Sequence, residues 1–304
     1  MNKGNGISSA NAAPAHGKIG KNNAFLCFAV VAAAYLVASI VLGLVQNAVN
    51  KGSAVWWICL AAANLVVGIS AALFLWRKGS SVWRDTAADV VPNPVHTLLC
   101  CVCAVGLVFC MSYVTNVLFD LMESWGLPRP SVDLPKQLVP LLLTATFLPA
   151  VSEELAFRGV VAQGLLRGSG NKVGGVVLSG ALFALFHVNP AQTLHQFFFG
   201  CLLAVLYLRG GSLWSCVIVH FVNNLVVVGA EFLLPESVYA DLTVCIVGGV
   251  VATLSFAAYI LFVKPTSSSM LRESFVVEKS EPVPVVAFVT SVAVFAVLWV
   301  AALV

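Results

Sequence analysis

Two acids and a base stand close together inside a long apolar run of the sequence: Glu153, Glu154 and Arg158. Glu154 and Arg158 are four residues apart, so on a helix they share a face and can pair. Glu153 points about 100° away from that face. Neighbouring carboxyl groups in a low-dielectric site cannot both ionise cheaply, and such surroundings can tune one of them to take a proton from water. The motif therefore predicts a general base, and a structural ion pair beside a spare protonated acid is the alternative.

A histidine motif follows in each of two later apolar runs. Phe183 precedes His187 by one helical turn, which predicts an aromatic ring packed beside the imidazole. His220 and Asn224 are also one turn apart, and an imidazole beside a carboxamide can stabilise a developing oxyanion. Asn223 points about 100° away from Asn224 and is expected to bond a neighbouring helix. Each pattern alone is also typical of ordinary polar contacts between helices.

The three motifs gain weight together, because the apolar runs contain few other ionisable side chains. Such groups are costly at membrane depth and by default indicate a functional site. Glu231 lies near the end of an apolar run and is expected at the membrane interface. His195 lies near the start of another run, where it either lines the site or faces a connecting loop. The sequence thus predicts one polar site built from several helices.

Membrane helices must position these residues. The 304-residue chain is 60% hydrophobic and 10% charged, whereas soluble domains carry about 25% charged residues. Continuous apolar runs of about 20 residues predict helices, which satisfy their own backbone groups in lipid. The expected fold class is all-α, a polytopic transmembrane helix bundle of about 8–9 spans. The predicted spans are residues 24–46, 54–76, 97–119, 138–166, 173–189, 192–209, 212–234, 242–263 and 285–304.

The polar segments divide the chain into four parts. Residues 1–23 are polar and are expected to be disordered, residues 24–263 form the bundle, residues 264–284 are a linker, and residues 285–304 are a C-terminal transmembrane helix. Lys and Arg collect on alternate loops, which predicts a cytoplasmic N-terminus in a plasma membrane. Pro149 predicts a kink or break within the fourth span.

Net charge and cysteines exclude some classes of function. The formal net charge is +3 and no basic stripe is interleaved with aromatic residues, so no nucleic-acid partner is expected. The nine cysteines lie within or at the ends of apolar runs and are expected to be small buried hydrophobes. Cys100 and Cys103 form a C-x-x-C that can bind metal or act as a redox pair, but no second pair completes a zinc site.

The order Glu-Glu-x-x-x-Arg, Phe-x-x-x-His and His-x-x-x-Asn resembles the CPBP family over about residues 138–230. That family comprises type II CAAX prenyl endopeptidases and bacteriocin-processing or bacteriocin-immunity proteins. The resemblance implies a peptidase core at about residues 138–234. It also implies that Glu153 is the base that activates water, that Glu154 is its partner, and that Arg158 holds this partner.

The same resemblance assigns roles to the histidine motifs. His187 is expected to position the water, while His220 and Asn224 stabilise the oxyanion of the tetrahedral intermediate. Phe183 and Asn223 are expected to support the site. All of these positions match the pattern of the family.

Metal is the open chemical question for this set of residues. Glu153, His187 and His220 can form a zinc site of two histidines and one carboxylate, with water as the fourth ligand. The sequence contains no His-Glu-x-x-His, and a second Glu beside the first suits general-base chemistry better than zinc ligation. We therefore expect no cofactor, and zinc is the alternative.

The predicted function is that of an intramembrane endopeptidase that cleaves a membrane-associated substrate with glutamate-activated water. The expected partners are the lipid bilayer and a peptide or lipidated protein, either CAAX-like and prenylated or bacteriocin-like. A non-catalytic partner or bacteriocin-immunity scaffold of the same fold is the alternative, and it would tolerate the loss of Glu153. A proton-coupled transporter is a third reading, disfavoured because the sequence shows no inverted repeat.

Overall fold

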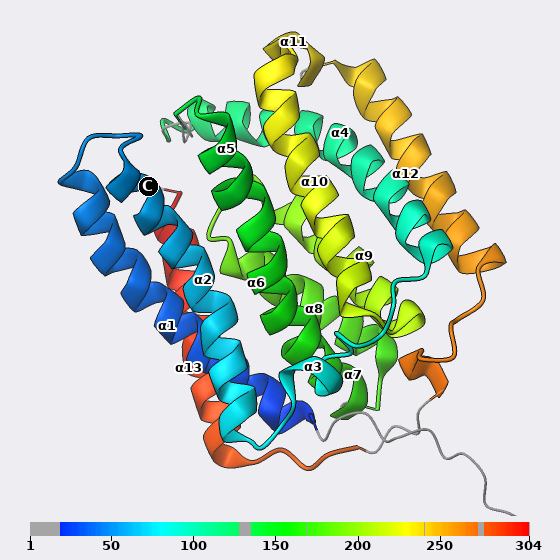
Figure 1. Cartoon of the computed structure of the whole chain (residues 1–304). Helices are drawn as coiled ribbons and strands as arrows, with labels where there is room; N and C mark the ends of the chain where they lie inside the picture. The colour runs from blue at the N-terminus through cyan, green and yellow to red at the C-terminus, as the bar shows by residue number, and fades with distance from the viewer. Residues whose placement is uncertain (1–18, 128–134, 169, 240, 273–276, 304) are drawn as a thin grey trace, which may run out of the picture.

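The computed structural model describes residues 19–127, 135–168, 170–239, 241–272 and 277–303. Most of these residues are helical, and no strand occurs among them (Figure 1). The elements in chain order are α1 Lys21–Asn47, α2 Ala54–Arg77, α3 Val82–Asp85, α4 Pro94–Ser124, α5 Leu138–Leu141, η1 Leu142–Phe147, α6 Leu148–Ala156, η2 Phe157–Ala162, α7 Gln163–Gly168, α8 Lys172–Phe186, α9 Thr193–Gly210, α10 Leu213–Leu233, α11 Glu236–Tyr239, α12 Leu242–Phe262, η3 Met270–Arg272 and α13 Pro282–Ala301. The predicted disordered N-terminal segment falls mainly outside the described ranges, and its last three residues begin α1.

Eight helical segments in the described part of the chain are long and apolar enough to cross a bilayer. They are α1, α2, α4, the continuous run from α5 to α7, α9, α10, α12 and α13. The remaining predicted span, α8, has only 15 residues. At 1.5 Å per residue it is shorter than a hydrocarbon core of about 30 Å. The all-α bundle is therefore confirmed, with eight candidate spans and one shorter apolar helix.

Capping residues set the ends of several spans. The side chains of Ser53, Asn93 and Asp241 each accept a hydrogen bond from a backbone N–H in the first turn of α2, α4 and α12 respectively. These bonds satisfy donors that a helix start leaves unpaired. Gly211 has φ of 66° and ends α9 in the left-handed conformation that glycine adopts at little cost. The sequence thus fixes where these helices begin and end.

The central run from α5 to α7 is helical without interruption, so of the kink or break predicted near Pro149 the break does not occur. Two π-helical turns, η1 and η2, flank α6 on either side. A π turn lengthens the hydrogen-bonded ring, and η1 ends just before the turn that contains Pro149. This widening accommodates a proline, which has no N–H to donate and crowds the preceding turn. The segment that carries Glu153 and Glu154 therefore lies between two local departures from regular α-helix.

The central run lies between α1 and α2 on one side and α10 on the other (Figure 1). Small residues allow close approach at several of these helix contacts, as in other membrane bundles. An added methyl group on Gly68 of α2 would lie 3.1 Å from the Ser152 side chain of α6. One on Gly200 of α9 would lie 3.0 Å from the Cα of Gly180 in α8. Both contacts lie near the polar motifs, and they bring the backbone of α2 close to α6 and that of α9 close to α8.

The C-terminal part of the chain packs against the bundle. Within the segment predicted as a linker, Ser269 donates a hydrogen bond of 2.8 Å to the carbonyl of Leu208 in α9. Helix α13 lies along α1, where the rings of Phe25 and Phe288 stack with centroids 4.4 Å apart. Phe295 of α13 stacks on Phe186, the last residue of α8, at 5.4 Å. Helix α13 therefore covers part of α8, the helix that directly precedes His187.

The cysteines are all free, as expected of small hydrophobes in a membrane bundle. Five of the nine are buried and four are partly buried. Cys100 and Cys103 of the C-x-x-C are both in the buried group.

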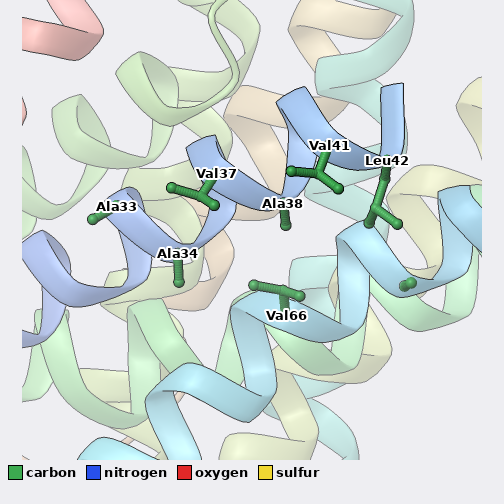
Figure 2. A pocket seen from close by; sticks show the side chains of 8 residues that line it. Ala33, Ala34, Val37, Ala38, Val41, Leu42 and Val66 are labelled. Atoms are coloured by element: carbon green, nitrogen blue, oxygen red, sulfur yellow. The ribbon is translucent and has the colours of Figure 1, made fainter. Parts of the chain in front are cut away.

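An open apolar groove of about 670 Å³ lies between α1 and α2 (Figure 2). It contains none of the residues of the three motifs. Its lining consists of Ala33, Ala34, Val37, Ala38, Val41, Leu42, Ala62 and Val66.

Candidate active site

Glu154 is the centre of a buried ion network that joins α6, η2 and α10. Its Oε1 accepts a hydrogen bond of 2.8 Å from Arg158 Nη1 and one of 2.7 Å from His220 Nδ1. The Glu154 and Arg158 side chains are fully buried, and that of His220 is 3% exposed. Charges buried to this degree are tolerated only when they are paired and hydrogen-bonded. The network therefore fixes all three side chains.

Arg158 extends this network to α8 and α9. Its Nη2 donates a hydrogen bond of 3.3 Å to the carbonyl of Gly200 in α9. Its guanidinium lies over the ring of Phe183 in α8, 4.4 Å from the centroid. A planar cation suits both contacts, because it donates in its plane and stacks across its faces. One side chain thus connects three of the elements that surround the site.

The contact with Glu154 also orients the imidazole of His220. A carboxylate can only accept, so the contact places a proton on Nδ1 of His220. The other ring nitrogen, Nε2, is directed away from Glu154. A histidine held in this way presents one defined nitrogen to its surroundings.

Glu153 has different neighbours, although it is the adjacent residue. Its Oε2 lies 3.7 Å from Nε2 of His187, and the two side chains are 12% and 23% exposed. This oxygen has no hydrogen-bond partner in the described part of the chain. A polar pair at this separation is commonly joined through water. Glu153 and His187 thus form the accessible half of the site.

His187 is held at the end of α8 by its own backbone. Its Nδ1 donates a hydrogen bond of 2.8 Å to the carbonyl of Phe183, which leaves Nε2 facing Glu153. The next residue, Val188, has φ of 47°, a left-handed conformation that is strained for a β-branched side chain. Strain of this kind is often found at functional sites. Helix α8 ends at Phe186, and this turn follows directly after its C-cap residue, His187.

Helix α10 contributes two asparagines beside His220. Asn223 is 2% exposed and Asn224 is partly buried. Asn223 Nδ2 donates a hydrogen bond of 3.2 Å to Asn224 Oδ1. The carbonyl oxygen of Asn224 is therefore engaged, and its Nδ2 is the group that can donate to an oxyanion.

Aromatic rings surround the imidazoles. The ring of Phe183 lies 4.7 Å from that of His187 and 5.8 Å from that of His220, as the one-turn spacing predicts for His187. Phe199 of α9 contacts His220 from another direction, at 5.4 Å. These rings exclude water from the ion network and so strengthen its electrostatic interactions.

His195 belongs to the same cluster, although its place was left open by the sequence. The side chain is 8% exposed and lies against the carboxamide of Asn223. Its ring lies 6.1 Å from that of Phe199, one helical turn later. The signal in the sequence was this one-turn spacing to Phe199, the same pattern that links Phe183 to His187. Glu231, in contrast, is exposed and lies outside the cluster.

Comparison with known proteins finds a family that matches the part of the chain that carries the site. Residues 135–226 match the sequence model of the family described as type II CAAX prenyl endopeptidase Rce1-like. The matched segment runs from the start of the central helical run into α10 and contains all three motifs. This match is consistent with the resemblance of residues 138–230 to the CPBP family. The eight apolar helices and the match together indicate an integral membrane protein with an all-α fold.

A curated relative also matches part of the chain. Sporulation-killing factor biosynthesis protein SkfC from Bacillus subtilis (strain 168) is 33% identical over 129 residues, which are 38% of this chain and 26% of that protein. The chain thus matches about a quarter of the length of this relative. No solved structure matches the chain.

The candidate ligands of a metal in the matched segment are Glu153, His187 and His220. Both histidines have Nδ1 engaged, which is the orientation that metal-binding histidines usually have. However, no three His, Cys, Asp or Glu side chains of the described ranges are gathered closely enough to hold a metal ion. The three residues do not fit a metal in this arrangement, so no catalytic step is routed through one. Catalysis without a metal stays a prediction.

Proposed function

We propose that this chain is an intramembrane endopeptidase in which Glu153 activates water. The observation that supports this most is that Glu153 Oε2 faces Nε2 of His187 at 3.7 Å from a side chain that is 12% exposed, whereas the Glu154 side chain is fully buried. The adjacent Glu154 is engaged by Arg158 and His220 and serves to position them. A general base must have an oxygen that is free to accept a proton, and Oε2 of Glu153 has no hydrogen-bond partner among the described residues.

The proposed reaction begins with a water held between Glu153 Oε2 and His187 Nε2. Glu153 removes a proton from this water as its oxygen attacks the carbonyl carbon of the scissile peptide bond. Asn224 Nδ2 and His220 donate hydrogen bonds to the oxyanion that forms, and the Glu154 carboxylate stabilises a protonated His220. The C–N bond then breaks and Glu153 returns its proton to the amine. The products are a carboxylate and an amine.

The proposed substrate is a membrane-associated peptide or lipidated protein. The Rce1-like match supports a CAAX-like, prenylated chain end, because the family is described as prenyl endopeptidases. The name of SkfC supports a second source, since that protein serves the biosynthesis of a sporulation-killing factor. The bilayer supplies the second partner, and we place the protein in the plasma membrane with a cytoplasmic N-terminus.

The experiment is a cleavage assay with the purified full chain in detergent. A panel of prenylated, unprenylated and bacteriocin-like peptides is incubated with the wild type, with Glu153→Gln and with Glu231→Gln, and the products are identified by mass spectrometry. Glu231→Gln is the matched control, because it changes an exposed glutamate outside the cluster. We expect cleavage by the wild type and the control and none by Glu153→Gln. An immunity or scaffold function that survives Glu153→Gln, without cleavage of any peptide, would contradict the proposal.

A further inference from the structure

Cys110 of α4 and Cys245 of α12 bring two thiols together outside the proposed active site. Their Sγ atoms are 4.0 Å apart, and both side chains are partly buried. Two neighbouring thiols on different helices can pack as small hydrophobes, or they can be oxidised to a disulfide. The packing of the two helices favours the second role for this pair.

Glycines bring the backbones of α4 and α12 close together beside the two thiols. A methyl group added to Gly248 would lie 2.8 Å from the backbone nitrogen of Cys110, and one added to Gly249 would lie 3.3 Å from its Sγ. One added to Gly106, a turn before Cys110, would lie 2.7 Å from the carbonyl oxygen of Gly248. A disulfide needs such a short separation of the two backbones, with the sulfurs about 2 Å apart. Rotation of the two cysteine side chains can therefore close the remaining distance without a large movement of either helix.

Helix α12 lies at the edge of the bundle, with α4 as its main neighbour (Figure 1). Its C-terminal end is held by Arg209 of α9, whose Nη2 donates a hydrogen bond of 2.5 Å to the carbonyl of Val263. Cys245 lies at the opposite end, in the first turn after the capping residue Asp241. A bond from Cys245 to Cys110 would therefore fasten the end of α12 that is remote from Arg209.

The depth of the thiol pair follows from the direction of the two helices. Gly106 of α4 lies against Ala252 of α12, whereas Cys110, further along α4, lies against Gly248, so the helices are antiparallel. Cys110 is therefore level with the first turn of α12. With the cytoplasmic N-terminus proposed above, α12 begins on the non-cytoplasmic side. Disulfides form and persist on that side of a plasma membrane.

We propose that Cys110 and Cys245 are a redox-active pair, whose disulfide fastens the non-cytoplasmic end of α12 to α4. The oxidant is a small-molecule disulfide, which reaches Cys245 first because this residue is nearer to a helix end. The Cys245 thiolate attacks one sulfur of the oxidant, which expels a first thiolate and leaves a mixed disulfide. The Cys110 thiolate then attacks Sγ of Cys245, which forms the bond between the helices and expels the second thiolate. The two cysteines lose two protons and two electrons, and the oxidant is reduced to two thiols.

The first test maps the bond directly. The purified full chain in detergent is incubated with oxidised glutathione, free thiols are blocked with N-ethylmaleimide, and unreduced proteolytic peptides are identified by mass spectrometry. We expect most wild-type chains to contain peptides linked through Cys110 and Cys245, and to migrate as monomers on a non-reducing gel. Cys110→Ser and Cys245→Ser should lack the link, whereas Cys101→Ser, the matched control at a partly buried cysteine of α4, should retain it. Thiols that stay open to N-ethylmaleimide after oxidation, or links between two copies of the chain instead, would overturn the proposal.

The second test measures whether the bond fastens α12. The melting temperature of the oxidised wild type should exceed that of the reduced wild type by about 4 °C or more, because the link restricts the unfolded chain. Cys245→Ser should melt at the same temperature in oxidised and reduced glutathione. Equal melting temperatures for the linked and the reduced wild type would overturn the fastening role. Neither test depends on cleavage of a peptide, so failure of the proposed function would leave this inference unaffected.

Discussion

Glu154 and Glu153 are consecutive residues of α6, yet their side chains enter different surroundings. Glu154 is fully buried and engaged by Arg158 and His220. Oε2 of each glutamate has no hydrogen-bond partner among the described residues, but the Glu153 side chain is 12% exposed and faces His187. A turn of about 100° between adjacent helical positions is enough to separate the two. The comparison teaches that one carboxylate stabilises the site while the other is left available for chemistry.

Substitutions in the buried half of the site should lower the stability of the fold. Arg158→Met keeps much of the side-chain volume but leaves the Glu154 carboxylate buried without its cation, which should cost about 3–5 kcal/mol of unfolding free energy. Unfolding of the detergent-solubilised chain, followed by circular dichroism, measures this loss. The double variant Arg158→Met with Glu154→Gln removes the unpaired charge and should recover part of it. A single variant as stable as the wild type would show that the network is not structural.

Substitution of Asn224, which lies between the two halves of the site, should lower the turnover number kcat. Asn224→Ala removes the proposed oxyanion donor and should lower kcat by about 10²–10³-fold, with a smaller effect on KM. The matched control is Asn93→Ala, which removes the cap of α4 far along the chain and should leave kcat unchanged. An effect of Asn224→Ala on KM alone would indicate a role in binding the ground state.

The accessible half should also lose turnover when the partner of Glu153 is removed. His187→Phe retains a ring next to Phe183 but removes the nitrogen that faces Glu153, so kcat should fall by about 10²-fold. The melting temperature should change little, because His187 is 23% exposed and takes no part in the buried network. A variant with wild-type kcat would exclude His187 from the positioning of water.

The smallest effect is expected outside both halves. Trp299→Phe removes the hydrogen bond from α13 to Thr193 and should cost about 1 kcal/mol of stability, with kcat unchanged. Thermal unfolding and the cleavage assay measure the two quantities on the same preparation. A large fall in kcat would instead mean that α13 positions the first turn of α9 for catalysis.

Much of this fold could be predicted from the sequence, because lipid allows few solutions. Continuous apolar runs define the helices to within a few residues, and the spacing of four predicts the pair of Glu154 and Arg158. The π turns around α6 could not be predicted, because a proline predicts a local distortion of a helix but not the form that this distortion takes.

Tertiary contacts account for the rest. Glu154 and His220 are 66 residues apart in sequence, and no local pattern indicates that their side chains meet. The burial of His195 follows from the packing of α9 against α8 and α10, so its sequence position alone left two interpretations open. Spacing along a helix predicts which residues share a face, but only the packing of helices shows which faces meet.

The most direct test of the account compares initial rates for the peptide that the wild type cleaves fastest. The rates are measured for the wild type, for the wild type treated with a chelator and then dialysed, and for Glu153→Gln. The account predicts equal rates before and after chelation and a loss of at least about 10²-fold in Glu153→Gln. Activity that is abolished by the chelator and restored by zinc, or that survives in Glu153→Gln, would contradict it.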